Sequence, residues 1–337
     1  MSLNELWFLL IAVLFTGFFF LEGFDFGVGM ATQILPKSDK ERRVLINTIG
    51  PFWDANEVWL ITAAGAMFAA FPHWYSTMFS GYYMLLTLIL LALIGRGVAF
   101  EFRGKIEGAA WRKVWDAAIF IGSFFPPLFF GMLFASMIKG VPIGQNMEMT
   151  AGFSDIVNLY SVTGGVAVVA LCLLHGLTFI SIRTTGDVRG KARKAAAVVW
   201  PVAVALLGLL AVQTFASTDL FEKRGVIMYI LVALTAVAAV LAYVFIRKGR
   251  EGLAFGMTGL LIGLTFIALF AGLFPRLMVS SIDSAYDLTV YNAASGGYTL
   301  KAMTIVTAVL LPFVLAYQAW SYFVFHKRIT NKDHLEY

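Results

Sequence analysis

Four carboxyl groups lie in stretches of the chain that are otherwise apolar. Glu22 and Asp25 lie in E-G-F-D-F-G-V-G, and Asp54 and Glu57 lie in P-F-W-D-A-N-E-V-W. Each pair is spaced i, i+3, which places both acids on roughly one face of a helix. Clusters of acids with few counter-charges are typical of proton relays. The alternative is that these carboxyls only form hydrogen bonds with neighbouring helices.

The composition places these acids in a bundle of membrane helices. Of the 337 residues, 60% are hydrophobic and 13% are charged, whereas soluble domains have about 25% charged residues. Stretches without charged residues recur along the chain and are long enough to cross a bilayer as helices, which needs about 20 residues. Only helices or closed barrels satisfy their backbone in lipid, and the alternation typical of barrel strands is absent.

We therefore predict an all-α integral membrane protein with nine transmembrane helices, arranged as two four-helix bundles plus one additional helix. A single polytopic membrane domain covers residues 1–337. The P-H-W-Y segment at 72–75 is predicted as the turn between the second and third spans, and Gly23 and Gly27 allow another helix to approach the first span closely. The predicted spans lie near 6–30, 53–71, 77–99, 116–138, 156–183, 195–217, 225–247, 252–275 and 301–325.

The lysines and arginines are distributed unequally between the loops. The loops after the first, third, fifth and seventh spans and the C-terminal tail hold 20 of the 25 Lys and Arg residues. By the positive-inside rule, the N-terminus is outside and the C-terminus is cytoplasmic. Residues 37–50 then form a short cytoplasmic connector, and residues 276–300 form the only sizeable external loop. The N-terminus lacks the basic region of a cleavable signal, so we expect the first span to be retained.

This topology places both acidic pairs in the cytoplasmic half of the membrane. Asp25 lies about 15 Å inside the cytoplasmic end of the first span. An acid at a helix centre costs about 2.5–3.5 kcal/mol, so Asp25 should face protein or water. Asp54 and Glu57 begin the second span, where acids in a first turn are also ordinary features favoured by the helix dipole. Arg96, at the end of the third span, is the counter-charge best placed to reach inward.

The histidines exclude a chain that binds several haems through paired imidazoles. Haem in a helical bundle usually needs axial His or Met ligands, and only His175 lies well inside a predicted span. His73 lies in a predicted turn, and His326 and His334 lie in the tail. We expect His175 to be a packed imidazole. The single cysteine excludes internal disulfides and thiolate clusters, and we predict no metal site and no catalytic residue. No nucleotide-binding or hydrolase motif is present, and no basic soluble domain could bind nucleic acid.

Longer strings of the sequence resemble subunit II of the cytochrome bd quinol oxidases. The first is G-F-D-F-G-V-G-M at 23–30, and the second is E-R-R-V-L-I-N-T-I-G-P-F-W-D-A-N-E-V-W-L-I-T-A-A-G-A-M-F-A-A-F-P at 41–72. W-R-K-V-W-D and I-G-S-F-F-P-P-L follow at 111–116 and 121–128. The resemblance is dense over residues 20–130. Beyond that region, mainly the number of spans and the loop pattern agree.

The resemblance implies a haem-free subunit in the cytoplasmic membrane of a bacterial-type cell. Its partner, subunit I, carries two haems b, haem d and the quinol site. The complex oxidises quinol, reduces oxygen to water and takes the protons from the cytoplasm, so it is electrogenic. The isolated chain would have no catalytic activity. A small single-helix third subunit is a further partner that the resemblance allows, and some relatives hold a tightly bound quinone in this subunit.

The resemblance also implies roles for particular residues. Asp25 and Asp54, with Trp53, match positions associated with a proton pathway along the interface between the subunits. Glu22 matches a position that is acidic in relatives. Glu57 matches the family less closely, because a neutral amide stands there in some members. These five residues are our candidates for the proton pathway.

Two other classes of function could use the same residues. A proton-coupled secondary transporter could use the buried acids, although such transporters often show broken helices and inverted repeats. A purely structural scaffold could use them only to hold helices together. Oxygen uptake driven by quinol would exclude the transporter, and replacement of the acids would test the scaffold.

Overall fold

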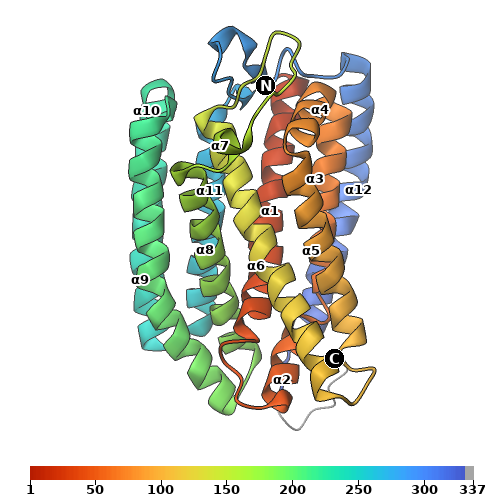
Figure 1. Ribbon diagram of the computed structural model, residues 1–337, viewed down its shortest axis with the longest axis vertical. Helices are drawn as coiled ribbons and strands as arrows, with labels where there is room; N and C mark the ends of the chain where they lie inside the picture. Colours follow the sequence, from red (N-terminus) through yellow and green to blue (C-terminus); the bar gives the residue numbers. More distant parts are fainter. Residues whose placement is uncertain (331–337) are drawn as a thin grey trace.

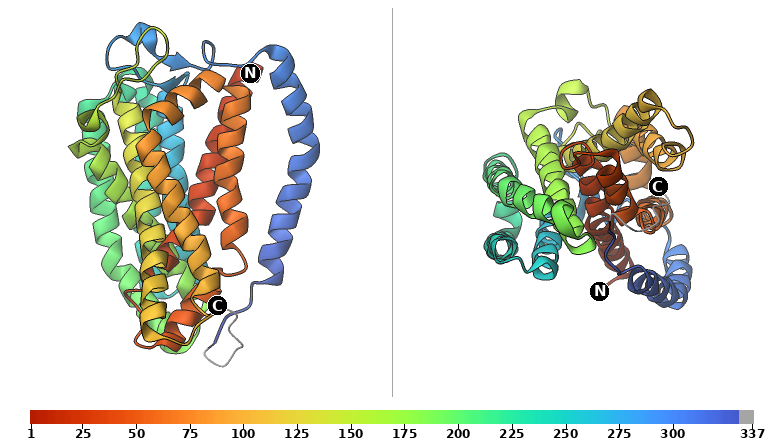
Figure 2. Two further views of the ribbon diagram at one scale, coloured as in Figure 1. Left: turned by 45° about the vertical axis from the view of Figure 1, so that its right-hand side comes forward. Right: turned by 90° about the horizontal axis from the view of Figure 1, so that it is seen from below.

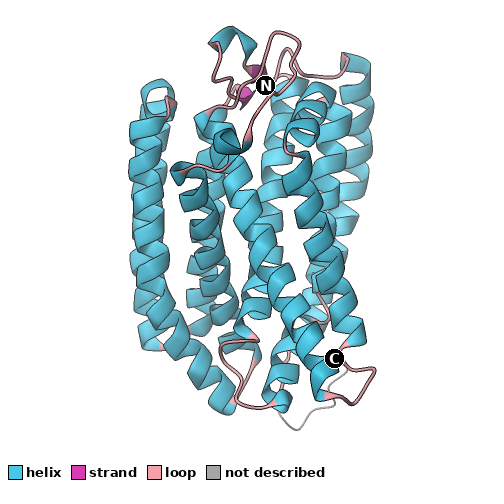
Figure 3. Cartoon of the chain, in the orientation of Figure 1, coloured by secondary structure: helices cyan, strands magenta, loops and turns pink. Residues whose placement is uncertain are grey.

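The computed structural model describes residues 1–330 as a bundle of long helices that run between two ends. Figure 1 shows the N-terminus at one end, here called the upper end, and the segment after the last helix at the opposite, lower end. Figure 3 shows that strands are confined to a small sheet at the upper end. The helices are α1 (Leu3–Ala31), α2 (Asp39–Ile49), α3 (Trp53–Ala70), α4 (Pro72–Gly81), α5 (Tyr83–Phe102), α6 (Ala109–Lys139), α7 (Phe153–Ile156), α8 (Leu159–Arg183), α9 (Gly186–Ser217), α10 (Leu220–Lys248), α11 (Glu251–Leu273) and α12 (Gly297–Val324).

Eight helices in the described part of the chain are long and apolar enough to cross a membrane. They are α1, α5, α6, α8, α9, α10, α11 and α12. The other predicted span, 53–71, corresponds to α3, which has 18 residues and carries Asp54, Asn56 and Glu57 in its first turns. It is not among the eight helices, although it packs against α1 within the bundle. The membrane-helical class is therefore found, while the count of nine spans stays a prediction.

The connection between the second and third predicted spans differs from the expectation. Residues 72–75, predicted as a turn, form the first turn of α4 instead. The chain bends one residue earlier, at Phe71 (φ −134°, ψ 68°). Pro72 then begins the helix, where its fixed φ suits the first turn and its missing N–H is not needed. A second break at Tyr82 (φ −99°, ψ 21°) separates α4 from α5.

Two loops pack together at the upper end. In the segment after α11, β1 (Arg276–Met278) pairs antiparallel with β2 (Leu288–Thr289), with the short 3-10 helix η1 (Ser284–Tyr286) between them. Residues 140–158 lie beside this segment, because Val141 and Val279 share a backbone hydrogen bond of 3.0 Å. The segment 276–300 is therefore packed against a second loop, 140–158, at the same end. At the lower end, the connector 37–50 folds mainly as α2.

Helices α1 and α8 lie at the centre of the packing. Helix α1 packs against α3, α6, α8 and α11, and α8 also packs against α6, α9 and α11. Aromatic rings fill the centre, and Phe19 of α1 stacks on Phe266 of α11 at 3.9 Å. Because α1 joins helices on every side, the division into two four-helix bundles stays a prediction. Helix α12 lies apart at the periphery (Figure 2), and of its residues only Leu300 is buried.

Small residues set the closest contact between α1 and α8. A Cβ atom at Gly27 would lie 2.0 Å from the backbone oxygen of Cys172 and 2.7 Å from the Cα of Gly176. A Cβ atom at Gly176 would likewise lie 2.4 Å from the carbonyl carbon of Gly27. Both neighbours are backbone, so neither can move aside as a side chain could. The predicted close approach therefore occurs at Gly27, which brings the acidic end of α1 against α8.

Replacement of Gly27 by alanine is expected to destabilise the bundle by about 3 kcal/mol, the upper part of the usual range for overpacked cores. The reason is that α1 and α8 must separate to admit the methyl group. Thermal unfolding of the purified protein and the amount of folded protein in membranes would measure the change. Gly208→Ala in α9 is the matched control, because a Cβ atom there meets nothing within 4 Å. Equal stability of the two variants would contradict this account.

Candidate functional site

A single buried arginine joins two of the predicted acids. Arg96 lies in α5, and its side chain is fully buried. Its Nη2 donates to Oε1 of Glu22 in α1 and to Oε1 of Glu57 in α3, the latter at 2.6 Å. The guanidinium also lies over the ring of Phe26, 4.7 Å from its centroid. Arg96 thus reaches inward to contact Glu22 and Glu57.

The backbone of α6 leaves room for this arginine. A Cβ atom at Gly122 would lie 2.4 Å from Cβ of Arg96 and 2.5 Å from the carbonyl oxygen of Ala92. Helices α5 and α6 can therefore approach until Arg96 is enclosed and directed towards α1 and α3. A larger residue at 122 would push α5 away from α6 and alter the position of the guanidinium.

The second acid of α1 is held through an amide. Asp25 is fully buried, and its Oδ2 accepts a hydrogen bond of 2.7 Å from Nδ2 of Asn56 in α3. Oδ1 of Asn56 accepts from the hydroxyl of Tyr322 at 2.9 Å and from Nε2 of Gln318 at 3.4 Å. Both donors belong to α12, which contributes little else to the core. Helices α1 and α3 and the sequence-distant α12 therefore meet at Asn56.

The group carries more acid than base. Glu22, Asp25 and Glu57 share one buried cation, Arg96, and only Glu57 is partly exposed, with 21% of its side chain accessible. Oε2 of Glu22 and Oδ1 of Asp25 accept no hydrogen bond from the described residues. Buried charge is tolerated only when it is paired, so acids in excess of cations favour retention of a proton within the group. The arrangement can therefore hold and exchange protons.

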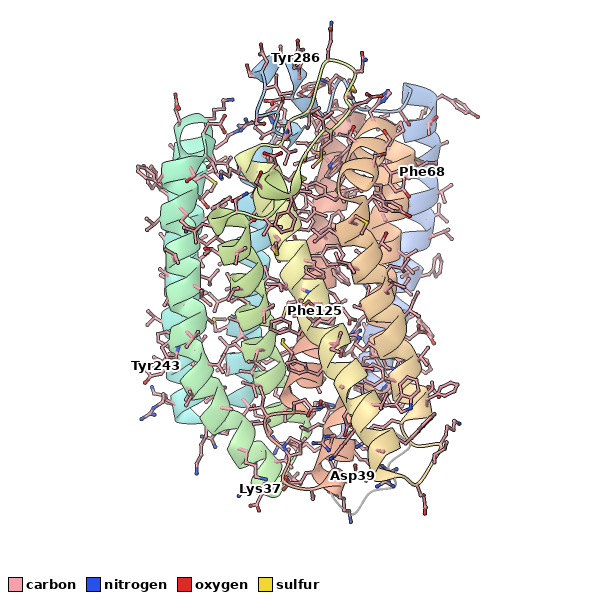
Figure 4. The ribbon with its side chains drawn as sticks, in the orientation of Figure 1. Lys37, Asp39, Phe68, Phe125, Tyr243 and Tyr286 are labelled. Carbon is pink, nitrogen blue, oxygen red and sulfur yellow. The ribbon has the colours of Figure 1, made fainter. Side chains whose placement is uncertain are left out.

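Two other predicted residues do not join this group. Asp54 is exposed on α3 and lies on about the same face as Phe68, four helical turns away, which Figure 4 labels. Trp53 is half-buried and packs on Phe100, with ring centroids 5.2 Å apart. The structure thus gathers Glu22, Glu57, Arg96 and Asp25, while Asp54 faces outward.

The site also contains residues that the sequence reasoning did not select. Gln318 and Tyr322 are one helical turn apart in α12, and Trp59 of α3 donates to Oε1 of Gln318 at 2.9 Å. Their i, i+4 spacing places both polar groups on one face of an otherwise apolar helix. That spacing was the available signal, although it does not show which helix the two residues face.

A network of ion pairs holds the lower end together. Arg103 binds Asp116 at 2.6 Å and Asp39 of α2 at 2.5 Å, and Arg42 binds Asp116 at 3.2 Å. Figure 4 labels Asp39 at this end. Partial burial raises the pKa of Asp39, but the hydrogen bond and charge of Arg103 outweigh this effect and hold that pKa below its ordinary value. The network fixes α2 against α5 and α6 and so orients the connection between the two acid-bearing helices.

A further ion pair ties α2 to α9. Nζ of Lys191 lies 2.8 Å from each carboxylate oxygen of Glu41. These hydrogen bonds lower the pKa of the Glu41 carboxyl. The contact adds to the attachment of the connector at the lower end.

The buried histidine has partners on both ring nitrogens. Nδ1 of His175 lies 2.8 Å from the hydroxyl of Thr258, and Nε2 lies 3.1 Å from the carbonyl oxygen of Phe20. The ring also stacks on Phe255 at 4.4 Å. This arrangement agrees with the expected packed imidazole. Among residues 1–330 no group of His, Cys, Asp and Glu could hold a metal ion, and His334 lies outside the described residues.

An apolar groove of about 1120 Å³ runs between α1, α11 and α12. Its walls are largely aromatic and aliphatic and include Phe20 of α1 and Phe270 of α11. Gln318 and Tyr322 line it from α12. One side of the groove therefore lies next to the hydrogen bonds that reach Asp25.

Comparison with known proteins places this architecture in a family. The model of a family described as cytochrome bd terminal oxidase subunit II matches residues 3–325. This chain belongs to that family. The resemblance seen in the sequence is thereby confirmed, and the chain is a multi-pass membrane subunit of a respiratory oxidoreductase.

Two relatives extend the match over the whole cytochrome bd subunit. Cytochrome bd ubiquinol oxidase subunit 2 of Bacillus subtilis (strain 168) is 56% identical over 337 residues, which cover 100% of this chain and 99% of that protein. Cytochrome bd-I ubiquinol oxidase subunit 2 of Escherichia coli (strain K12) is 36% identical over 364 residues, covering 98% of this chain and 96% of that protein.

A solved structure shares the fold of this cytochrome bd subunit. A chain of the bd oxidase from Geobacillus thermodenitrificans superposes with a TM-score of 0.75 and covers 97% of this chain and 100% of that one. Its sequence identity is 16%, so this likeness concerns the fold alone. The helical arrangement thus recurs in a bd oxidase of known structure.

Proposed function

We propose that this chain is the haem-free subunit II of a quinol:oxygen oxidoreductase, and that its buried carboxyls carry protons towards the oxygen-reducing site of subunit I. The observation that carries the proposal is the group of Glu22, Asp25 and Glu57 around the single cation Arg96. Acids inside a membrane bundle are rare and usually mark an ion or proton path. Relatives named as ubiquinol oxidase subunits support the reaction class.

The direction of proton movement follows from the distribution of charge. Of the 25 Lys and Arg residues, 20 lie in the loops, the adjoining helix ends and the C-terminal tail that we assign to the cytoplasmic side. The lower end of the bundle is then cytoplasmic, the N-terminus is outside, and α2 lies on the cytoplasmic surface. Moving a proton from the cytoplasmic side across an opposing membrane potential of 100 mV costs about 2.3 kcal/mol. Proton uptake for water formation would therefore generate membrane potential without a separate pump.

The exposed acid fits a path at the boundary between the subunits. Asp54 faces away from this chain, and Glu57 is the member of the buried group with a partly accessible side chain. We propose that subunit I covers this face of α3, and that Trp53 and Asp54 lead protons to Glu57, Glu22 and Asp25. Arg96 stays cationic and limits how much negative charge the acids must hold while protons pass.

The haems of the complex are assigned to the partner. Both nitrogens of His175 already have hydrogen-bond partners, and Phe255 stacks on its ring, so the residues around it do not fit an axial ligand of haem. We propose that haem b and haem d lie in subunit I, where quinol and oxygen react. A small single-helix third subunit is a further proposed partner.

The groove between α1, α11 and α12 fits a tightly bound quinone. Its apolar walls suit an isoprenoid tail, and Gln318 and Tyr322 supply polar groups beside it. Such a quinone would serve as a bound structural group or an electron carrier. In this chain Phe20, Phe270 and their neighbours would enclose the tail and exclude water.

The reaction is tested on the complex purified from its native membranes. Quinol added to proteoliposomes should drive oxygen uptake, with protons taken up from the side that bears α2, and the preparation should show the absorbance of haem d. A transporter would instead move protons with a solute and consume no oxygen when quinol is added. Oxygen uptake without proton uptake from that side would contradict the relay.

A further inference from the structure

A chain of hydrogen bonds with one possible direction ends at Asp25. It begins at Trp59, whose indole N–H lies 2.9 Å from Oε1 of Gln318. Nε2 of Gln318 lies 3.4 Å from Oδ1 of Asn56, and Nδ2 of Asn56 lies 2.7 Å from Oδ2 of Asp25. The hydroxyl of Tyr322 adds a second contact to Oδ1 of Asn56, at 2.9 Å.

The chemistry of the first residue fixes the direction of the whole chain. An indole N–H can only donate, so Gln318 must turn its oxygen towards Trp59. The amide nitrogen of Gln318 is then left to donate to Asn56. Asn56 in turn must present its oxygen to Gln318 and its nitrogen to Asp25. The opposite orientation would place the Nδ2 donor of Asn56 against the Nε2 donor of Gln318.

The last link therefore acts on one particular oxygen atom. Oδ2 of Asp25 faces an N–H group and can only accept, since an amide nitrogen does not take up a proton in a hydrogen bond. Oδ1 of Asp25 accepts no hydrogen bond from the described residues and is buried. The two oxygens of this carboxyl are thus inequivalent.

We propose that Trp59, Gln318, Asn56 and Tyr322 are positioning residues that assign the exchangeable proton of Asp25 to Oδ1. This proposal rests on the proposed function, in which Asp25 carries a proton. With Oδ2 held by Asn56, the proton enters and leaves at Oδ1 only, and the carboxyl does not turn to present its other oxygen. Each transfer therefore starts from one geometry.

Two of these residues, Gln318 and Tyr322, come from α12, which lies at the periphery of the bundle. Within α12 only Leu300 is buried, so Gln318 and Tyr322 are not side chains of a densely packed core. The ring of Tyr322 stacks on Phe52 at 4.5 Å, nearly parallel at 3°. Its contact with the bundle thus has a packing part, carried by the ring, and a hydrogen-bonding part, carried by the hydroxyl.

These two parts can be separated experimentally in the assembled oxidase. Tyr322→Phe keeps the stacked ring and removes the hydroxyl, and Trp59→Phe removes the donor that sets the direction. The matched control is Tyr317→Phe in the same helix, where the residue is 67% exposed and its ring packs on Trp320. Haem content reports assembly, and infrared difference spectra report the carbonyl stretch of the protonated Asp25, identified as the band that Asp25→Asn removes.

We expect Tyr322→Phe and Trp59→Phe to move that band and to lower oxygen turnover about fivefold, the factor that corresponds to one typical hydrogen bond. Tyr317→Phe should do neither. Tyr322→Phe could instead lower assembly or turnover while the band stays in place. The hydrogen bonds would then only attach α12 to the bundle, and the proposal would be overturned. The proposed function is judged separately, since it fails if Asp25→Asn itself leaves oxygen turnover unchanged.

Discussion

Replacement of Arg96 by leucine is expected to prevent stable assembly of the oxidase. The substitution leaves Glu22 and Glu57 without their shared cation, and Glu22 is fully buried. Removing one partner of a buried ion pair typically lowers the free energy of unfolding by about 3–5 kcal/mol, because the remaining charge is uncompensated. Such a loss is a large fraction of the stability of a typical domain. Haem content of membranes and thermal unfolding in detergent would measure it.

The control for this experiment is an arginine of the lower end. Arg112 pairs with Asp39 at 3.3 Å, and 39% of its side chain is exposed, so Arg112→Leu should change stability little. A second arm combines Arg96→Leu with Glu22→Gln and Glu57→Gln, which removes the unpaired charges and should restore part of the assembly. If Arg96→Leu assembled as well as Arg112→Leu, the arginine could not be neutralising buried acids.

Replacement of Asp25 by asparagine is expected to leave the complex assembled and to lower oxygen turnover on the order of 100-fold, the lower limit typical for a positioned acid or base. The amide has nearly the shape of the carboxyl and can still accept from Asn56, so the fold should persist. It cannot carry a proton, so proton uptake should fall in parallel. Oxygen consumption and proton uptake by proteoliposomes would show both effects.

Three further variants serve as a control and as tests of the other acids in the proposed path. Asp187→Asn changes an exposed carboxyl in the first turn of α9 and should behave as the parent. Asp54→Asn should also lower turnover strongly, and Glu57→Gln should do so less. If Asp25→Asn and Asp54→Asn both retained parental turnover and proton uptake, the relay would be wrong and a structural role for the acids would stand.

The membrane class and the acidic pairs could be predicted because each depends on local sequence. Apolar segments without charge predict membrane helices directly. The i, i+3 spacing of Glu22 and Asp25 correctly placed both inside the bundle. The same rule failed for Asp54 and Glu57, because residues three apart point about 60° away from each other on a helix. The boundary between the buried and exposed sides of α3 falls within that angle.

The partners of Asn56 could not be predicted from the sequence. Gln318 and Tyr322 are 262 and 266 residues away from it in the chain. Their approach depends on how the tertiary structure places α12 beside α3, and no local pattern encodes that placement. Similarly, the contact between residues 140–158 and the segment after α11 depends on two loops meeting across the end of the bundle.

The position of α12 in the chain has a consequence for biosynthesis. Helices α1, α3 and α5, which carry Glu22, Asp25, Glu57 and Arg96, leave the ribosome long before residues 318–322 are made. Until then the oxygen of Asn56 lacks the donors of Gln318 and Tyr322. The ion-paired part of the site can therefore form early in synthesis, whereas the hydrogen bonds that orient the amide towards Asp25 are complete only when α12 has been inserted.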